Sequence, residues 1–299
     1  MLASFLTIIF FSFSVIFASR SAKVLGGQRA NAARLALALV LLATWAHSFG
    51  KGLQGPSLGW FLWSGFIGFG LGDMALFGAL PRIGPRLAIL LTQCLAAPLA
   101  ATVEWLWLGT RLQWAEVGCA ALILAGVAFA LAPDHGWEGS RRTFWVGALF
   151  GLGSAGGQAL GAVISRKALL VAEQAGFHLD GGTAAYQRLL AGAVTTWIAL
   201  AIFQRWQRAA PVEGTAPVPW RKGAPLVAGN ALAGPVLGVA CFQWALQTTP
   251  SGVVLPIVAT SPLVTMALAF AMDGARPPRR AATGSVLAVA GAVLMKMLH

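Results

Sequence analysis

Long apolar runs alternate with short polar breaks along the whole chain. Most runs have the length that an α-helix needs to cross a bilayer, about 20 residues. The alternating segments of about ten residues that mark β-barrel strands are not visible. The pattern predicts an all-α membrane protein with ten transmembrane helices, at residues 2–19, 32–49, 57–80, 85–108, 115–132, 143–165, 184–204, 223–246, 251–272 and 281–298.

The first apolar run has no basic residue in front of it, as a secretory signal peptide would have. Cleavage after Ala18 is the alternative to a retained first helix. We expect the helix to be retained, because the second half of the chain contains its counterpart.

An internal repeat is the most informative feature of the sequence. Matching segments recur in the same order in the two parts of the chain. The matches are GFGLG at 68–72 followed by Ala79-Leu80 with GPVLG at 234–238 followed by Ala245-Leu246, Arg34-Leu35 with Arg188-Leu189, and Ser19-Arg20 with Ser165-Arg166.

The matches divide the chain into two similar halves. We expect a first repeat at 1–132, a linker at 133–142 and a second repeat at 143–299. Since each repeat has an odd number of spans, the two repeats have opposite orientations in the membrane. This inverted plan is typical of secondary transporters, which bind substrate near the midplane between the repeats.

Composition agrees with a chain that has lipid as its solvent. Charged residues make up 10% of the chain, against roughly 25% in a soluble domain, and mean hydropathy is +0.75. The net charge of +12 comes from basic residues between apolar runs, where they contact anionic headgroups. A basic stripe with stacking aromatics is absent, so we expect the lipid bilayer and not nucleic acid as a partner.

No residue pattern indicates a metal or a cofactor. Cys94, Cys119 and Cys241 lie inside apolar runs and form no CxxC pair. The four histidines lie in or near predicted loops, so none is placed to bind a metal at mid-span. No nucleotide-binding motif is present either.

One helical pattern occurs twice. A helix ends in Ala-Leu, the next helix carries a proline and then an acid, and a glycine-rich helix follows. The residues are Ala79-Leu80, Pro98, Glu104 and Gly118 to Gly126 in the first copy, and Ala245-Leu246, Pro262, Asp273 and Gly284 to Gly291 in the second. Through this pattern the chain resembles the EamA-like family of the drug/metabolite transporter superfamily, over nearly its whole length. The resemblance implies a ten-helix exporter with a central cavity.

Asp73 is the one acidic residue well inside a predicted span. An ionised carboxylate there is costly unless it is paired or hydrated. It is either a coupling or counter-charge site for the transported solute, or a hydrogen-bonded acid that ties its helix to a neighbour. The repeat places Val239 at the equivalent position, so the fold itself does not require an acid. This favours the functional interpretation.

Other polar and aromatic side chains at membrane depth are candidates to bind substrate. Each amide needs a partner, because lipid offers none. We expect interhelical ties from some of them and cavity donors from others. The candidates beside Asp73 are Gln93, Gln158, Asn230, Gln243 and Trp244. The hydroxyl residues are weaker candidates, because most hydroxyls bond their own backbone; these are Ser12, Ser14, Ser154, Thr260 and Ser261.

Small residues and prolines predict the packing of the bundle. Glycines spaced by four place a small surface on one helix face and allow backbones to approach closely. They are Gly68, Gly72, Gly153, Gly157, Gly161, Gly234 and Gly238. Prolines interrupt backbone hydrogen bonds and are expected to kink helices around a cavity. They are Pro98, Pro235, Pro256 and Pro262.

Glu104 and Asp273 lie at equivalent helix ends in the two repeats. Because the fold symmetry explains such a pair, we expect a structural role. Glu104 is predicted to cap a helix or to pair with Arg111, and Asp273 with Arg276 or Arg280.

Together these features predict a secondary transporter that exports amino acids or similar small neutral, zwitterionic or cationic metabolites by alternating access. We find no lysine or arginine at mid-span, so strongly anionic substrates lack a partner. Protons are a candidate coupling ion. The alternative is a non-transporting scaffold or an intramembrane enzyme. We expect a multi-pass protein of a bacterial cytoplasmic membrane, as a monomer or a homodimer.

The orientation of the termini has two conflicting indications. Relatives usually place both termini in the cytoplasm. The positive-inside rule favours the reverse, because termini inside would put 15 of the 21 basic residues on the far side. The cytoplasmic side would then hold only Lys51, Arg111, Arg166, Lys167, Arg188 and Lys296.

Overall fold

The computed structural model describes residues 1–132, 140–208, 220–274 and 279–298, without the side chains of residues 28, 203–208, 273 and 279. All regular elements in these ranges are helical. They are α1 (Leu2–Leu25), α2 (Gly27–Ser48), α3 (Leu58–Gly65), η1 (Phe66–Gly72), α4 (Asp73–Leu108), α5 (Trp114–Leu131), α6 (Arg141–Gln174), α7 (Gly181–Arg208), α8 (Trp220–Ala231), η2 (Leu232–Gly238), α9 (Val239–Thr248), α10 (Ser251–Val258), α11 (Ser261–Asp273) and α12 (Arg279–Met297).

Nine helical stretches of the described residues are long and apolar enough to cross a membrane. One of them, Leu58–Leu108, has 51 residues, more than twice the length of one crossing. It changes direction at Gly84, whose φ of 75° and ψ of 161° are not helical. A positive φ of this kind suits glycine, which has no Cβ to clash with the backbone. The predicted spans 57–80 and 85–108 lie on either side of this bend.

Two short π-helical segments, η1 and η2, interrupt the third and eighth predicted spans at matching places. They cover the GFGLG and GPVLG stretches, each together with the two residues before it. Pro235 has no N–H to donate within η2, and glycines in both segments reduce crowding as the helix widens. Such segments often occur at functional sites.

The ninth predicted span is broken into α10 and α11. The α-helix ends at Val258 and resumes at Ser261, and Pro262 stands in the first turn of α11. Proline is well suited to that place, because the first N–H groups of a helix have no partner inside it. The predicted kink at Pro262 is therefore the start of a new helix, and Pro256 lies inside the preceding short one.

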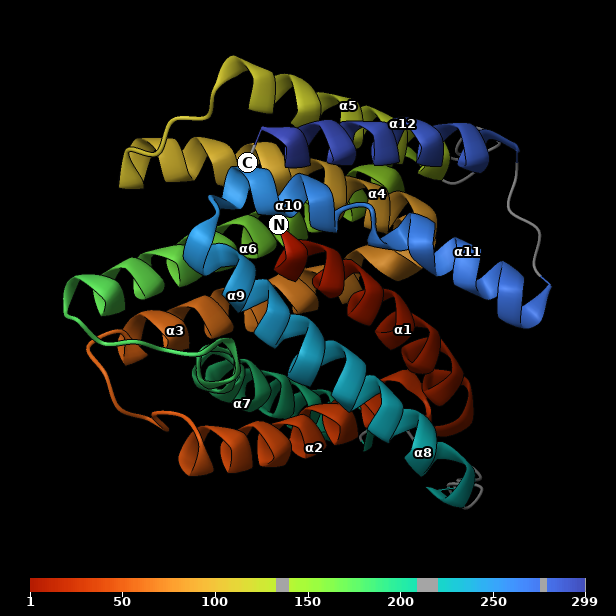
Figure 1. The fold of residues 1–299 in the computed structure, drawn as a ribbon. Coiled ribbons are helices and arrows are strands. Elements are labelled where there is room, and N and C mark those ends of the chain that lie inside the picture. The colour runs from red at the N-terminus through yellow and green to blue at the C-terminus, as the bar shows by residue number, and fades with distance from the viewer. Residues whose placement is uncertain (133–139, 209–219, 275–278, 299) are drawn as a thin grey trace.

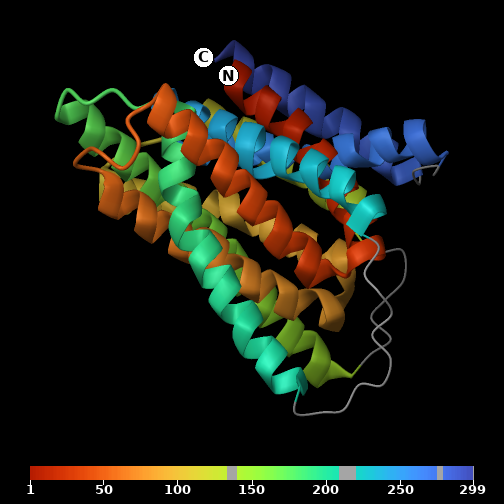
Figure 2. The ribbon, with the colours of Figure 1, turned by 90° about the horizontal axis from the view of Figure 1, so that it is seen from below.

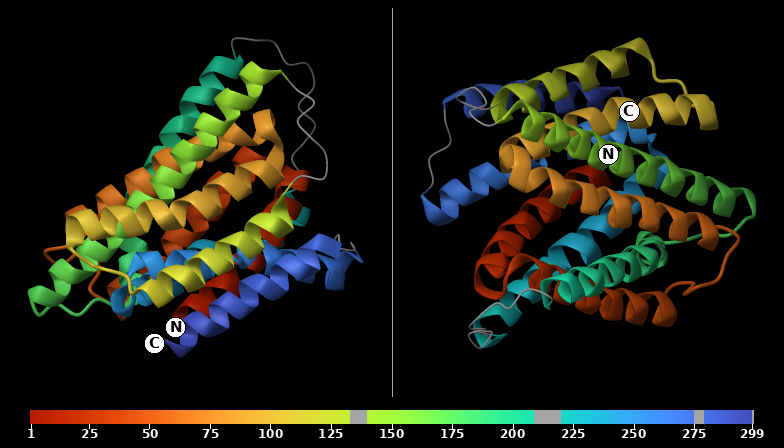
Figure 3. Two further views of the ribbon diagram at one scale, coloured as in Figure 1. Left: turned by 90° about the horizontal axis from the view of Figure 1, so that it is seen from above. Right: turned by 180° about the vertical axis from the view of Figure 1, so that it is seen from behind.

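The helices form a bundle with two outer pairs (Figure 1). α5 packs along α12 at one edge, and α2 packs along α7 at the opposite edge. The two ends of the chain lie near each other (Figure 2). α6 runs along α4 and α3 across the bundle (Figure 3).

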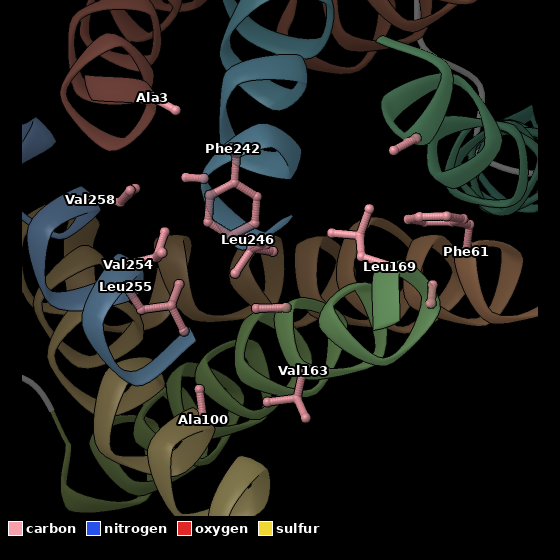
Figure 4. Packing of buried hydrophobic residues seen from close by; sticks show 14 of the residues in the cluster. Ala3, Phe61, Ala100, Val163, Leu169, Phe242, Leu246, Val254, Leu255 and Val258 are labelled. Carbon is pink, nitrogen blue, oxygen red and sulfur yellow. The ribbon is translucent and has the colours of Figure 1, made fainter. Parts of the chain in front are cut away.

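The largest buried cluster joins α9 and α10 to α4 and α6 (Figure 4). Phe242 and Leu246 of α9 point toward Val254 and Leu255 of α10. Alanines fill much of the remaining contact. Helices gain little from the hydrophobic effect when lipid is the alternative neighbour, so close van der Waals packing of small residues supplies the attraction.

Asp180 caps α7 just outside its membrane span. Its carboxylate accepts hydrogen bonds from Thr183 N at 2.9 Å, from the Thr183 hydroxyl and from Trp45 Nε1 at 2.9 Å. Partial burial acts to raise the pKa of Asp180, but the hydrogen bonds from Thr183 and Trp45 exceed that effect and lower the pKa below 3.8.

Candidate functional site

A cavity of about 270 Å³ is lined by residues from both halves of the chain. At about 30 Å³ per water molecule this is the volume of about nine waters, which suits a small metabolite. Its polar lining is Ser14, Arg34, Asp73, Thr92, Gln93, Ser154, Gln158, Arg188 and Ser261. Its apolar lining includes Phe11, Val15, Leu35, Phe69, Leu76, Val239, Phe242 and Val258.

Asp73 is the first residue of α4, directly after η1, and its side chain lines this cavity. Arg34 of α2 and Arg188 of α7 both attract its carboxylate electrostatically. Both arginines also line the cavity. The one acidic residue well inside a predicted span therefore shares the cavity with two cations.

Arg188 is held between aromatic rings. Its guanidinium carbon lies 4.9 Å from the centre of the Phe69 ring and 5.8 Å from that of Phe242. Cations are attracted to the faces of such rings. The residue is only 6% exposed, and its Nε has no hydrogen-bond partner among the described residues.

Arg34 has amide partners instead. Its Nε donates to Asn31 Oδ1 at 2.7 Å, and its Nη1 donates to Asn230 Oδ1 at 3.4 Å. The Ser14 hydroxyl donates to the same Asn230 oxygen at 2.7 Å. Asn230 thus supports two residues that line the cavity without lining it itself.

The other amides divide between the cavity and the packing around it. Gln158 of α6 donates to Gln93 of α4 at 2.9 Å, and both line the cavity. Gln243 is fully buried outside the lining and donates to the Ser165 hydroxyl at 3.3 Å. Trp244 is 44% exposed on α9 and is not part of the lining.

The comparisons with known proteins agree with this architecture. The model of the EamA-like transporter family matches residues 1–132 and 145–297. The chain belongs to this family. It is therefore an integral, multi-pass membrane transporter of the drug/metabolite superfamily, and the predicted family and helical membrane fold are confirmed.

A solved structure shares the fold of this EamA-like transporter. Its title reads only "Crystal structure of protein", and it matches with a TM-score of 0.76 at 22% sequence identity. The match covers 99% of this chain and 96% of the other. No curated protein matches the sequence.

The predicted glycines of this EamA-like transporter line a close contact between η1 and α6. A Cβ at Gly157 would lie 2.5 Å from the Cα of Gly72, and a Cβ at Gly161 would lie 3.0 Å from the Cα of Gly68. Gly153 faces Ala75 more loosely, with 3.5 Å between the Cβ positions. Gly72 is followed directly by Asp73, so this contact also positions the acid.

The glycines of η2 face α1. Gly234 lies against Ser14, and Gly238 lies against Phe11. The cavity lining includes Ser14, Phe11 and Gly234. The glycines therefore allow α1 to approach η2 closely beside the cavity. Pro235 also lines the cavity, whereas Pro98 lies inside α4 away from the lining.

Glu104 joins three helices at one end of the bundle. It is 1% exposed. Its Oε2 accepts hydrogen bonds from the first residue of α10, through Ser251 N at 2.6 Å and the Ser251 hydroxyl. Its Oε1 lies 3.7 Å from Arg166 Nε of α6. Arg166 Nη1 also donates to the carbonyls of Leu246 and Gln247 at the end of α9. We call Glu104, Arg166 and Ser251 the clasp.

The clasp corrects the predicted partner of Glu104. Pairing with Arg111 was wrong, because Glu104 faces Arg166. Gly109 ends α4 in the left-handed conformation, and Arg111 lies exposed in the irregular segment that follows. The predicted helix-capping role is correct, although the capped helix is α10. The side chain of Asp273 and all of Arg276 lie outside the described residues.

The sequence analysis did not place an arginine in the cavity. Arg34 and Arg188 lie near the starts of the predicted spans 32–49 and 184–204, and the structure shows that both line the cavity. The signal was present, since both belong to the Arg-Leu match between the repeats. The sequence match by itself indicates only a structural repeat. Arg188 is the clearest residue that the candidate site gains from the structure.

Proposed function

We propose that this EamA-like transporter exports amino acids or similar small metabolites as a secondary transporter, by alternating access. The charged cavity carries the proposal. Asp73, Arg34 and Arg188 supply both signs of charge in a space that otherwise has many apolar walls. A zwitterion with an apolar side chain complements such a lining, because each charged end has an opposite charge to approach.

The proposal includes two inverted repeats, at 1–132 and 143–299, with 133–142 as the linker. Three observations support this division. The family model matches the chain in two segments, η1 and η2 occupy equivalent places, and the two arginines of the Arg-Leu match line the same cavity. The linker itself lies largely outside the described residues.

We propose that the clasp closes one end of the transport path. Phe242 and Val258 line the cavity and also belong to the largest buried cluster. The clasp residues bind the end of α9 and the start of α10, the same two helices that carry those side chains. Opening this end would require Arg166 and Glu104 to release α9 and α10.

Asp73 is our candidate for coupling to protons. It is partly exposed in the cavity and flanked by cations, and its repeat counterpart Val239 also lines the cavity but cannot titrate. The cavity is therefore asymmetric in charge while its backbone follows a repeat. Exchange of a proton at one carboxylate would link the two directions of movement. We place the transporter in a bacterial cytoplasmic membrane.

Counterflow in proteoliposomes tests this proposal, because it does not depend on the orientation of the protein. Vesicles are loaded with a panel of amino acids and related amines, and uptake of labelled counterparts is followed with wild type and Asp73→Asn. We expect saturable counterflow of at least one amino acid by wild type. We also expect its pH dependence to be lost in Asp73→Asn and kept in Glu173→Gln, which changes an exposed acid of α6. Absence of counterflow for every solute would refute the proposed function.

A further inference from the structure

Arg188 differs from its repeat counterpart Arg34 in what it binds. The offset that aligns the two arginines aligns Asn31 with Ala185. The offset that aligns Gly68 with Gly234 aligns Asn230 with Ser64. Both amides that hold Arg34 are therefore replaced by residues without an amide at Arg188.

Ser64 does not take over the role of Asn230. Its hydroxyl donates to Gly161 O at 2.6 Å and lies 2.8 Å from the Ser165 hydroxyl. Its hydrogen-bonding capacity is thus used between α3 and α6. Arg188 consequently lines the cavity with 6% of the residue exposed, so it is 94% buried, and its Nε has no hydrogen-bond partner in the described part of the chain.

Glycines keep the space that the Arg188 guanidinium occupies. A Cβ at Gly68 would lie 2.7 Å from Arg188 Nη2, and a Cβ at Gly161 would lie 3.0 Å from the same atom. Phe69 and Phe242 face the guanidinium carbon. The glycine contact that packs η1 on α6 therefore also forms the slot for this side chain.

A buried guanidinium with an unused donor is costly unless an anion completes its hydrogen bonds. Its planar donors match a carboxylate, which can accept two parallel N–H bonds. Asp73 attracts Arg188 but is shared with Arg34. With all three ionised, the cavity carries one net positive charge, which a single carboxylate would offset.

We propose that Arg188 is the carboxylate-binding residue of this transporter, so that its substrates must carry a carboxylate. Arg34 is the counterpart whose donors are held by the amides of Asn31 and Asn230. This inference rests on the proposed transport function and narrows its substrate class. It removes simple amines from the possible substrates. It also reverses the expectation from the sequence that an anionic group of the substrate lacks a basic partner.

Ligand binding to the purified protein in detergent tests the inference. The probes are amino acids, each with its decarboxylated amine and its deaminated acid, such as L-leucine, isoamylamine and isocaproate. Binding is read as thermal stabilisation, which rises with ligand concentration relative to Kd. Binding is preferred to flux here, because amines and acids cross bilayers unaided in their neutral forms. We expect the stabilising compounds to contain a carboxylate and their matched amines to have no effect.

Arg188→Gln should weaken binding of the best carboxylate at least about tenfold, as expected for loss of a charged hydrogen-bond partner. Arg82→Gln is the matched control. Arg82 also lies over a phenylalanine ring, with its guanidinium carbon 4.9 Å from the centre of Phe150, but it does not line the cavity. We expect its affinity to stay within about twofold of wild type.

The inference is overturned if an amine stabilises the wild type as strongly as its amino acid, or if no carboxylate in the panel binds. It is also overturned if folded Arg188→Gln binds like Arg82→Gln. If Arg188→Gln does not fold, binding of the matched amino acids, amines and acids to the wild type still tests the inference. Saturable counterflow of amines without carboxylates, above that of protein-free vesicles, would refute this inference and leave the transport function intact. Absence of all counterflow would refute the function itself.

Discussion

Replacing Glu104 by alanine should destabilise the protein strongly through the clasp. The substitution removes the acceptor of two hydrogen bonds from Ser251 and the charge facing Arg166. Glu104 is 1% exposed and the Arg166 side chain is 13% exposed, so water can replace few of the lost interactions. Breaking a buried pair by removing one partner costs about 3–5 kcal/mol. Glu104→Gln keeps the shape and one acceptor oxygen, and should cost roughly half as much.

These energies translate into a measurable shift in Tm. An unfolding entropy of ~2.1 cal/mol/K per residue gives about 0.6 kcal/mol per degree for a chain of 299 residues. Glu104→Ala should therefore lower Tm by about 5–8 °C. The free cysteines Cys94, Cys119 and Cys241 are partly buried, so a thiol-reactive dye reports unfolding in detergent.

Glu173→Ala is the control for this prediction. Glu173 is an exposed acid that also interacts electrostatically with Arg166. As a surface substitution it should change stability by no more than about 0.5 kcal/mol. If Glu104→Ala unfolds at the same temperature as Glu173→Ala, the clasp does not stabilise the bundle and our interpretation of it is wrong.

Two further predictions concern packing and capping. Gly157→Ala should destabilise by about 1–3 kcal/mol, because its Cβ would lie 2.5 Å from the Gly72 backbone. Gly156→Ala should not, because no described atom outside its own helix backbone lies within 4 Å of its Cβ; equal Tm values for the two variants would contradict the close contact. Asp180→Ala should cost about 1 kcal/mol near neutral pH by loss of the α7 cap. Because the folded-state pKa of Asp180 lies below 3.8, this difference should persist above pH 3.8 and shrink as the pH falls through the folded-state pKa; a gap in Tm that stays constant down to about pH 3 would count against the carboxylate cap.

The fold could be predicted because lipid constrains it strongly. Each span must be a long apolar helix, so hydropathy alone marks the spans, and the repeated glycine and proline positions relate the two parts. Three features could not be obtained in this way. The bend at Gly84 depends on one backbone conformation, the π-segments depend on hydrogen bonds inside a helix, and the break before Ser261 depends on local packing.

The site was harder to predict, because sequence position does not give the direction of a side chain. Asp73, Gln93 and Gln158 line the cavity, as expected of candidate residues. Gln243 and Trp244 also lie within a predicted span, but their side chains are not part of the lining. Arg188 was missed because its place in the cavity depends on contacts between distant segments. Its slot requires glycines from two other helices, and that proximity exists only after the bundle has formed.

Counterflow of labelled amino acids in proteoliposomes is the most direct test of the central claim. We expect saturable exchange of at least one amino acid by wild type, strongly reduced exchange by Arg188→Gln, and unchanged exchange by Arg82→Gln. Vesicles that show no exchange of any amino acid above protein-free controls would contradict amino-acid transport by this protein.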